Sequence, residues 1–162
     1  MKVLYTRKGE EIYVDDHRYA EFSKHTWRLD SNGYVMRSIR IDGKVVNVYM
    51  HTEIMKTPKG MYCDHRDLNT RNNTDDNLRN CTPRQNSHNK GKHKVSAATS
   101  KYKGVSYDKT NRKWITNIVD LTGKRNFLGR FLEEEKAALA YNEAAKHFIG
   151  EFARLNQVGE VT

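Results

Sequence analysis

A polar run between residues 69 and 76 constrains this chain more than any other feature. It holds three asparagines, two threonines and two aspartates, so it cannot build a hydrophobic core and favours a long hairpin loop. The preceding strand is predicted to end at Asp64-His65, with a turn at Arg66. The return strand is predicted at 77–81. Thr82 then suits an N-cap and Pro83 the first helical position, so the unit is strand, loop, strand and helix.

The end of the first of these two strands carries two groups of chemical interest. Asp64 offers an anionic oxygen to a hard divalent cation, and the neighbouring His65 can take a proton from water near neutral pH. Adjacent side chains of a strand point to opposite faces. Both groups can therefore serve one phosphate only if the turn at Arg66 re-aims one of them. The alternative is that an Asp-His pair beside an asparagine-rich loop is merely part of a turn.

These residues resemble the HNH endonucleases, whose active site is a ββα fold closed over one metal ion. The resemblance covers Asp64-His65, the segment 76–79 and Gln85-Asn86, in the order and spacing of phage-type homing endonucleases. It implies that His65 is the general base, that Asn77 fixes the loop that aims His65, and that Asp64 and Asn86 are metal ligands. His88 and Asn89 lie close to Asn86, so the ligand from the helix remains open among these three.

Phosphodiester hydrolysis requires an activated nucleophile, stabilisation of negative charge and help for the leaving oxygen, and one metal with one histidine can supply all three. We expect Mg²⁺ as the ion, with Mn²⁺ as the alternative, and products with a 5′ phosphate and a 3′ hydroxyl. Cys63 and Cys81 are the only cysteines and form no C-x-x-C pair, so no structural zinc and no small-molecule cofactor are expected.

Composition favours two small modules that bind a polyanion. Hydrophobic residues make up 36% of the 162 residues, which limits the size of any single core. The formal net charge of +9 favours double-stranded DNA as the partner, although a merely basic soluble protein would have the same charge. There is no long apolar run, so we expect no membrane association and an intracellular, soluble protein.

The N-terminal part is predicted to form antiparallel strands. Short strands are expected at 3–5 and 10–14, an irregular or helical turn at 18–24, and further strands at 25–29, 34–41 and 44–49. The turns Asn32-Gly33 and Asp42-Gly43 are strong hairpin indicators. Basic residues on these strands, such as Arg28 and Arg40, would line DNA phosphates or simply be solvated.

A short helix at 51–56 is predicted next, and it carries a further histidine. HNH proteins of the kind described above often have a histidine at this place, as His51 stands here. His51 either contacts the active site or packs beneath the ββα unit.

The segment after the nuclease unit is strongly basic. There is no acidic residue between Asp76 and Asp108, and residues 91–100 lack periodicity, which indicates a linker. We expect it to follow the phosphate backbone, where each neutralised phosphate adds salt-dependent affinity. The predicted DNA contacts here are Arg79, Lys90, Lys92 and Lys94.

The C-terminal part resembles the Apetala-two, or ethylene-response-factor, DNA-binding domain. Strands are expected at 103–107, 113–119 and 125–128, with a helix at about 133–148 that Gly150 ends. The resemblance rests on Tyr102, Gly104-Val105, Trp114, Ile118, Leu128-Gly129, Phe131, Ala137-Ala138, Ala140-Tyr141, Ala144-Ala145, Gly150, Ala153 and Asn156. It implies a three-stranded sheet in the major groove, backed by one helix. The residues expected to contact DNA are Lys103, Ser106, Arg112, Lys113, Asn117, Lys124 and Arg125.

The predicted fold class is therefore α+β. Antiparallel strands lead into a ββα-metal nuclease (1–90, with its core at about 61–90), a basic linker (91–100) follows, and a three-stranded antiparallel sheet on one helix (101–158) completes the chain. The predicted function is that of a monomeric, site-specific DNA endonuclease of the homing type. By the resemblance we expect it in the cytoplasm of a phage-infected or bacterial cell. The alternative is a sequence-specific DNA-binding regulator with an inactive nuclease domain, and an RNA-binding protein finds little support.

Overall fold

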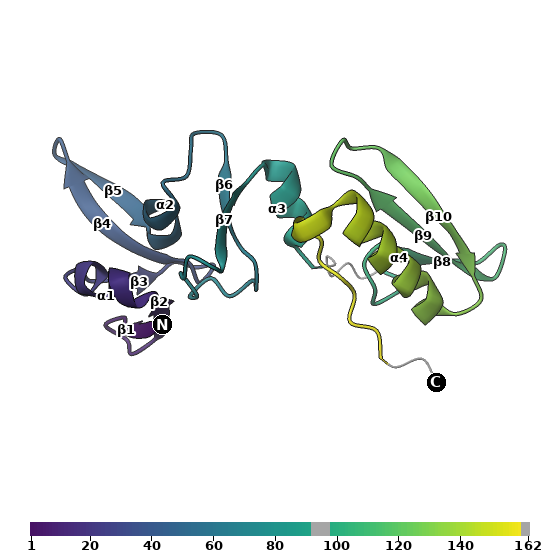
Figure 1. Cartoon of the computed structure of the whole chain (residues 1–162), viewed down its shortest axis with the longest axis horizontal. Coiled ribbons are helices and arrows are strands. Elements are labelled where there is room, and N and C mark those ends of the chain that lie inside the picture. The colour runs from purple at the N-terminus through teal and green to yellow at the C-terminus, as the bar shows by residue number, and fades with distance from the viewer. Residues whose placement is uncertain (92–97, 160–162) are drawn as a thin grey trace. The chain divides into compact units, whose positions relative to one another are not determined.

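The computed structural model describes residues 1–91 and 98–159, and they form two compact units. The first comprises Met1–Pro83 and the second Arg84–Thr162, as far as it is described. The predicted nuclease domain extends to residue 90, beyond the end of the first unit at Pro83. Its helix, Pro83–Asn89, therefore lies in the second unit except for its first residue. The architecture is a mixture of small antiparallel sheets and short helices, as the predicted α+β class requires (Figure 1).

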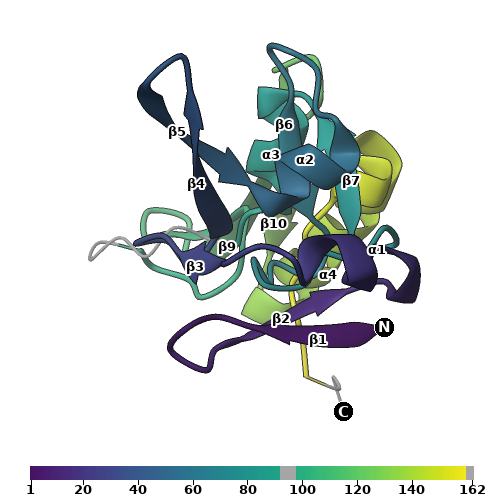
Figure 2. The ribbon, with the colours of Figure 1, turned by 90° about the vertical axis from the view of Figure 1, so that its left-hand side faces the viewer.

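The first unit begins with the antiparallel pair β1 (Lys2–Tyr5) and β2 (Glu11–Val14), followed by α1 (Asp16–Phe22). A three-stranded sheet follows in the order β3 (Arg28–Leu29), β4 (Val35–Ile41) and β5 (Lys44–Tyr49). Figure 2 shows β1 with β2 as one ribbon and β4 with β5 as another. The strand predicted at 25–29 is shorter than expected, because only Arg28 and Leu29 pair with β4.

The rest of the first unit is α2 (Met50–Met55) and the antiparallel pair β6 (Tyr62–His65) and β7 (Leu78–Cys81). One hydrophobic core joins these elements to the N-terminal strands. It is built from Leu4, Ile12, Val14, Phe22, Trp27, Val35, Met50, Ile54 and Leu78, and the partly buried Cys63 packs against it. Since α2 and both N-terminal sheets share this core with β7, they form the support on which the β6–β7 hairpin rests.

The second unit begins with nearly all of α3 (Pro83–Asn89), which starts at the predicted proline. The sheet order is β10 (Arg125–Phe131), β9 (Lys113–Val119) and β8 (Val105–Asp108), all antiparallel. The helix α4 (Glu134–Phe148) lies across this sheet, and a 3₁₀ turn, η1 (Gly150–Phe152), follows it (Figure 1). Ala137 and Ala138 are fully buried, so α4 packs closely on Tyr102 and Val105.

Two boundaries of the predicted C-terminal sheet are wrong. β8 begins at Val105 rather than at residue 103, and β10 continues to Phe131 rather than ending at residue 128. The register shifts between Phe127 and Gly129, where Gly129 has a φ of 137°. This bulge lets the strand resume pairing past the point where the alternation of side chains is interrupted.

Candidate active site

The β6 strand ends at the two residues that the sequence singled out. Asp64 and His65 are 5% and 4% exposed, and His65 is the last residue of the strand. The backbone N–H of Arg66 donates a hydrogen bond of 2.9 Å to the carbonyl of Asn77, so the chain turns at Arg66 as predicted. Two consecutive polar side chains are thus buried, and they point to opposite faces of the hairpin.

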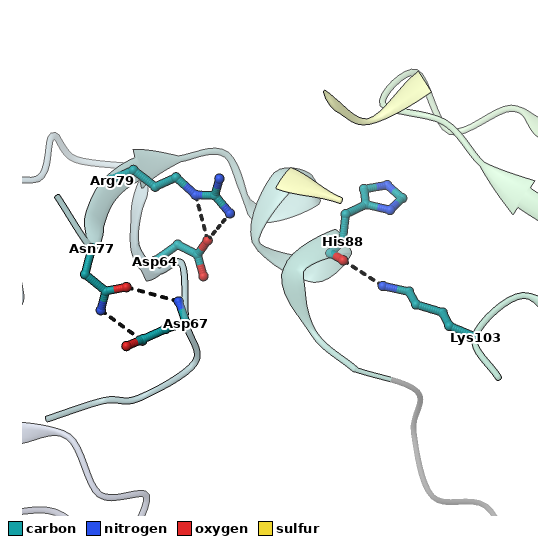
Figure 3. Close-up of polar contacts among 6 residues, drawn as sticks. All are labelled: Asp64, Asp67, Asn77, Arg79, His88 and Lys103. Atoms are coloured by element: carbon teal, nitrogen blue, oxygen red, sulfur yellow. Dashed lines mark hydrogen bonds and ion pairs between the residues drawn. The ribbon is translucent and has the colours of Figure 1, made fainter. Parts of the chain in front are cut away.

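Asn77 holds the loop that follows His65. Its amide nitrogen donates to Asp67 Oδ1 at 2.9 Å and to the carbonyl of Asn72 at 2.8 Å. Its side-chain oxygen Oδ1 accepts a bond of 3.0 Å from the backbone N–H of Asp67 (Figure 3). One side chain therefore ties both ends of the loop together next to the end of β6.

The same loop is also attached to the N-terminal sheet. The backbone N–H of Tyr13 donates to the carbonyl of Arg71 at 2.9 Å, and the N–H of Asn73 donates to the carbonyl of Tyr13 at 2.8 Å. Asn73 is fully buried. The polar run that looked like a solvated hairpin loop is in part an interior segment whose backbone groups bond to β2.

A cluster of rings surrounds His65, and the sequence indicated only one of its members. The ring centroid of His65 lies 5.2 Å from that of His51 and 5.9 Å from that of Tyr34. Tyr34 and Tyr49 lie 5.3 Å and 5.5 Å from His51. His51 therefore contacts the predicted base. Tyr34 gave no indication in the sequence, because it follows the Asn32-Gly33 turn and reaches His65 only through the fold.

Burial sets the protonation of both histidines. It lowers the pKa of His51 to about 4, helped by the neighbouring His65. The pKa of His65 is also lowered by burial, while Asn73, Asp67 and Asp64 oppose the shift. A lowered pKa keeps His65 neutral near neutral pH, which is the form that can accept a proton.

Asp64 forms a buried ion pair with Arg79. The guanidinium donates to Asp64 Oδ2 from Nε at 3.0 Å and from Nη2 at 2.8 Å (Figure 3). Arg79 is 6% exposed. A DNA contact was predicted for Arg79, but a buried guanidinium already paired with a carboxylate is not placed to reach a phosphate.

The three candidate ligands on α3 differ in their surroundings. Asn86 is partly exposed, whereas Asn89 is 3% exposed. The His88 side chain lies against the backbone of Asp120, and burial together with the nearby Lys103 and Arg84 lowers its pKa. Asn86 is thus the candidate whose amide is least enclosed. A carboxylate from Asp64 and an amide oxygen from Asn86 are both hard donors, which fits Mg²⁺ or Mn²⁺.

Four of the predicted DNA contacts lie on the sheet face that α4 leaves open. Trp114, Thr116 and Ile118 on β9 face the helix, so Lys113 and Asn117 point away from it. Ser106 pairs with Ile115 and Arg125 with Val119, which places them on this open face as well. Arg112 and Lys124 lie at the two turns and are exposed.

This open face also carries a pair of residues that sequence reasoning did not select. Phe127 pairs with Asn117 and is 55% exposed, and the Arg130 guanidinium lies 5.3 Å from its ring centroid. The sequence could have indicated Phe127, because the alternation of its strand places this phenylalanine on the face opposite the helix. Lys90, which directly precedes the predicted linker, is exposed, whereas Lys92 and Lys94 of the linker lie outside the described residues.

Lys103, another of the predicted DNA contacts, is bound to backbone groups of the second unit. Its ammonium donates to the carbonyls of His88 and Lys90 at 2.7 Å each, and burial lowers its pKa to about 8. Two of the three N–H donors of this ammonium thus bind backbone carbonyls, and a contact of Lys103 with DNA stays a prediction.

A group of possible metal ligands also occurs away from His65. Asp15, His17 and Asp75 bring one ligand atom each to within 4.8 Å of one another, among the residues described. However, Asp75 pairs with Arg18 at 2.8 Å, and Asp15 accepts a bond of 2.7 Å from the Asp75 N–H. Local ion pairing and loop closure account for this exposed cluster.

Within the described part of the chain, no helix is long and apolar enough to cross a membrane. No family model and no solved structure matches the chain. It is 33% identical over 153 residues to the "Uncharacterized HNH endonuclease L560" of Acanthamoeba polyphaga mimivirus, covering 93% of this chain and 77% of that protein. It is also 37% identical over 97 residues to "Protein 3.8" of Escherichia phage T7, covering 60% of this chain and 77% of that protein.

Proposed function

This chain belongs to the HNH endonuclease family, and from that premise we propose that it is a site-specific DNA endonuclease of the homing type. The observation that carries the proposal is the junction at the end of β6. His65 lies there in a buried, neutral state, and Asn77 fixes the loop that follows it with three hydrogen bonds. A general base needs this combination of a lowered pKa and a defined orientation.

In the proposed reaction, His65 removes a proton from the attacking water. Tyr34 and His51 pack against its ring and restrict its orientation. Asn77 acts through the loop rather than on the substrate. Cleavage in this way leaves a 5′ phosphate and a 3′ hydroxyl.

Asp64 and Asn86 would hold the divalent ion, for which Mg²⁺ is our first candidate and Mn²⁺ our second. When bound, such an ion stabilises charge on the scissile phosphate and on the leaving oxygen. Arg79 orients the Asp64 carboxylate through its two bonds to Oδ2. A carboxylate held in one orientation is suited to bind a cation.

We assign target recognition to the C-terminal unit, as an Apetala-two-type domain. A three-stranded sheet with one open face and a helix on the other supports this assignment, and Lys113, Asn117 and Arg125 on the open face would contact duplex DNA. Ser106, Asp108 and Val119 stand where plant members of that family have arginine. The DNA sequence recognised therefore differs from that of the plant proteins.

The first test is metal-dependent cleavage by the full chain. The substrate is duplex DNA selected for high affinity from random sequence, incubated with Mg²⁺ or Mn²⁺ and with chelator. We expect His65→Ala to lower the cleavage rate by at least about a hundredfold while it binds the same DNA, since a general base contributes about that much. His25→Ala is the matched control, because His25 is exposed.

A different result would favour the DNA-binding regulator. If the wild-type chain binds its selected DNA but leaves it intact with both metals, the nuclease assignment fails. Equal rates for the wild type and His65→Ala, with chelator still inhibitory, would instead retain a nuclease and remove His65 as its base.

A further inference from the structure

The C-terminal end of α3 is bound by residues of the second unit. Lys103 Nζ donates to the carbonyl of His88 at 2.7 Å (Figure 3) and to that of Lys90 at 2.7 Å. The backbone N–H of Arg154 donates to the carbonyl of His88 at 3.3 Å. The last carbonyls of a helix lack intrahelical partners and form the negative end of its dipole. An ammonium at this point both satisfies and stabilises the end of the helix.

The side chains of α3 are held by the same unit. Arg84 packs so closely on Gly123 that a Cβ at that glycine would overlap the Arg84 guanidinium. The His88 side chain lies against the Asp120 backbone in the same β9–β10 turn. α3 is therefore fixed by side chains along its length and by Lys103 at its end.

The backbone of Lys103 is itself held in place by hydrogen bonds of two asparagine side chains, which connect it to α4. Asn156 accepts a bond of 2.7 Å from the Lys103 N–H and donates one of 3.1 Å to its carbonyl. Asn142 on α4 in turn exchanges bonds of 2.9 Å and 2.7 Å with the backbone of Asn156. Asn142 is 8% exposed. Because amides satisfy both backbone groups of Lys103, its position follows from the packing of α4.

The environment of Lys103 differs from that of a surface lysine. Burial lowers its pKa to about 8, and the nearby Arg154 adds to the effect. Removing an ammonium from water costs free energy unless it is bound, and the two carbonyls supply the bonds. A lysine that serves a phosphate would be expected to remain solvated until DNA arrives.

We propose that Lys103 is a positioning residue for the nuclease reaction. It fixes the last turn of α3, and with it Asn86, so the DNA-recognition unit contributes to cleavage as well as to binding. This inference rests on the proposed function, because it concerns the helix that carries the candidate metal ligand. Lys103 touches neither the metal nor the DNA in this role.

The test compares full-length Lys103→Met with the wild type in three measurements. Hydrogen exchange across 83–89 reports on α3 directly, DNA affinity is measured in chelator, and cleavage is measured at saturating DNA over a range of Mn²⁺ concentrations. We expect exchange in α3 to become at least about tenfold faster, since the capping bonds are lost. We expect the cleavage rate or the Mn²⁺ affinity to fall by about 10- to 100-fold, as for residues that orient a metal ligand.

Two further variants separate positioning from charge. Lys103→Arg keeps a cation with several donors and should recover most of the rate. Lys109→Met removes a lysine from the exposed β8–β9 turn and should match the wild type in α3 exchange and in cleavage. DNA affinity should stay within about threefold in all variants, because in this role neither Lys103 nor Lys109 contacts a phosphate.

Unchanged α3 exchange and an unchanged rate in Lys103→Met would overturn the role of Lys103. A loss of DNA affinity with a full rate at saturating DNA would also overturn it, and would make Lys103 the phosphate contact that the sequence suggested. If the wild-type chain itself does not cleave its selected DNA, the proposed nuclease function fails and this inference fails with it. If the wild type cleaves the DNA and Lys103→Met is equally active, the nuclease function stands and only the role of Lys103 fails.

Discussion

The ion pair between Asp64 and Arg79 is the contact of the first unit whose loss we expect to cost most. Both side chains are almost fully buried and joined by two hydrogen bonds. Replacing Arg79 by methionine would leave the carboxylate without its cation. We expect the free energy of unfolding to fall by about 3–5 kcal/mol.

Urea denaturation followed by Trp27 fluorescence, in a Trp114→Phe background, measures this loss, because Trp27 is buried in the first unit. Arg40→Met is the control, since Arg40 is exposed on β4 and should change stability by less than about 0.5 kcal/mol. If Arg79→Met lowered the free energy of unfolding by no more than Arg40→Met does, the ion pair with Arg79 would not be needed for the stability of the first unit.

His51 gives the first unit a defined dependence on pH. Its pKa is lowered from 6.5 to about 4 by burial and by His65, and Asp30 opposes the shift. As pH falls from about 6.5 to about 4, the unfolded chain binds a proton that the folded chain does not. Stability therefore falls with pH in this window, by about 3 kcal/mol when fully developed.

His51→Phe should remove most of this slope, because phenylalanine can occupy the same ring cluster without titrating. Unfolding free energies at several pH values between about 7 and about 4.5 test this, with the C-terminal His147→Gln as control. An equal slope in the wild type and His51→Phe would assign the pH dependence to His65 or to another group.

Individual residues differ in how far their roles could be predicted. Asp64, His65 and Asn77 were selected by spacing, and the fold buries all three. Tyr34 and Asn73 were not selected, because their proximity to His65 arises from contacts between separate segments. Arg79 was assigned to DNA from its charge, and Lys103 from the resemblance to the Apetala-two domain. Charge alone does not distinguish a solvated cation from one whose partner lies on another element.

At the scale of elements, Gly104 determines how α4 packs on its sheet. Gly104 has a φ of 77°, and a Cβ there would lie 2.7 Å from the Asn117 carbonyl oxygen and would overlap the Tyr141 ring. Gly104→Ala should therefore destabilise the second unit by about 2–4 kcal/mol, from overpacking and from the positive φ.

The measurement is urea denaturation followed by Trp114 in a Trp27→Phe background. Gly150→Ala is a matched control, because Gly150 also has a positive φ but a Cβ there would meet nothing within 4 Å. Its loss should stay near about 1 kcal/mol. Equal losses for the two variants would indicate that backbone strain, rather than overlap with Tyr141, sets the cost.

Most elements were predictable because the residues that begin and end them act locally in the sequence. Asp42-Gly43 closes the β4–β5 hairpin, with both residues at positive φ, as a two-residue turn requires. Pro83 begins α3, because the fixed φ of proline suits the first position of a helix. The errors occur at β3, at the start of β8 and at the end of β10, because these boundaries depend on pairing with a neighbouring strand. A bulge or a missing partner leaves little trace in the pattern of a single strand.

For the whole molecule, the net charge of +9 predicts salt-dependent DNA binding. If the open face of the C-terminal sheet and the basic segment together neutralise about six phosphates, affinity should fall by on the order of 10³-fold between about 50 and about 200 mM salt. Lys113→Ala should reduce the slope of log K against log salt by about one. A slope near zero would contradict electrostatic binding to duplex DNA.

The sequence by itself determined the α+β class, the order of most elements and the resemblance to the HNH endonucleases, because hydrophobic period, turn residues and motif spacing act within a few residues. The tertiary structure decided which polar groups are buried together. It paired Asp64 with Arg79, brought Tyr34 and His51 against His65, and attached the end of α3 to Lys103. Each of these contacts joins segments from different elements, and their geometry depends on the packing of the cores between them.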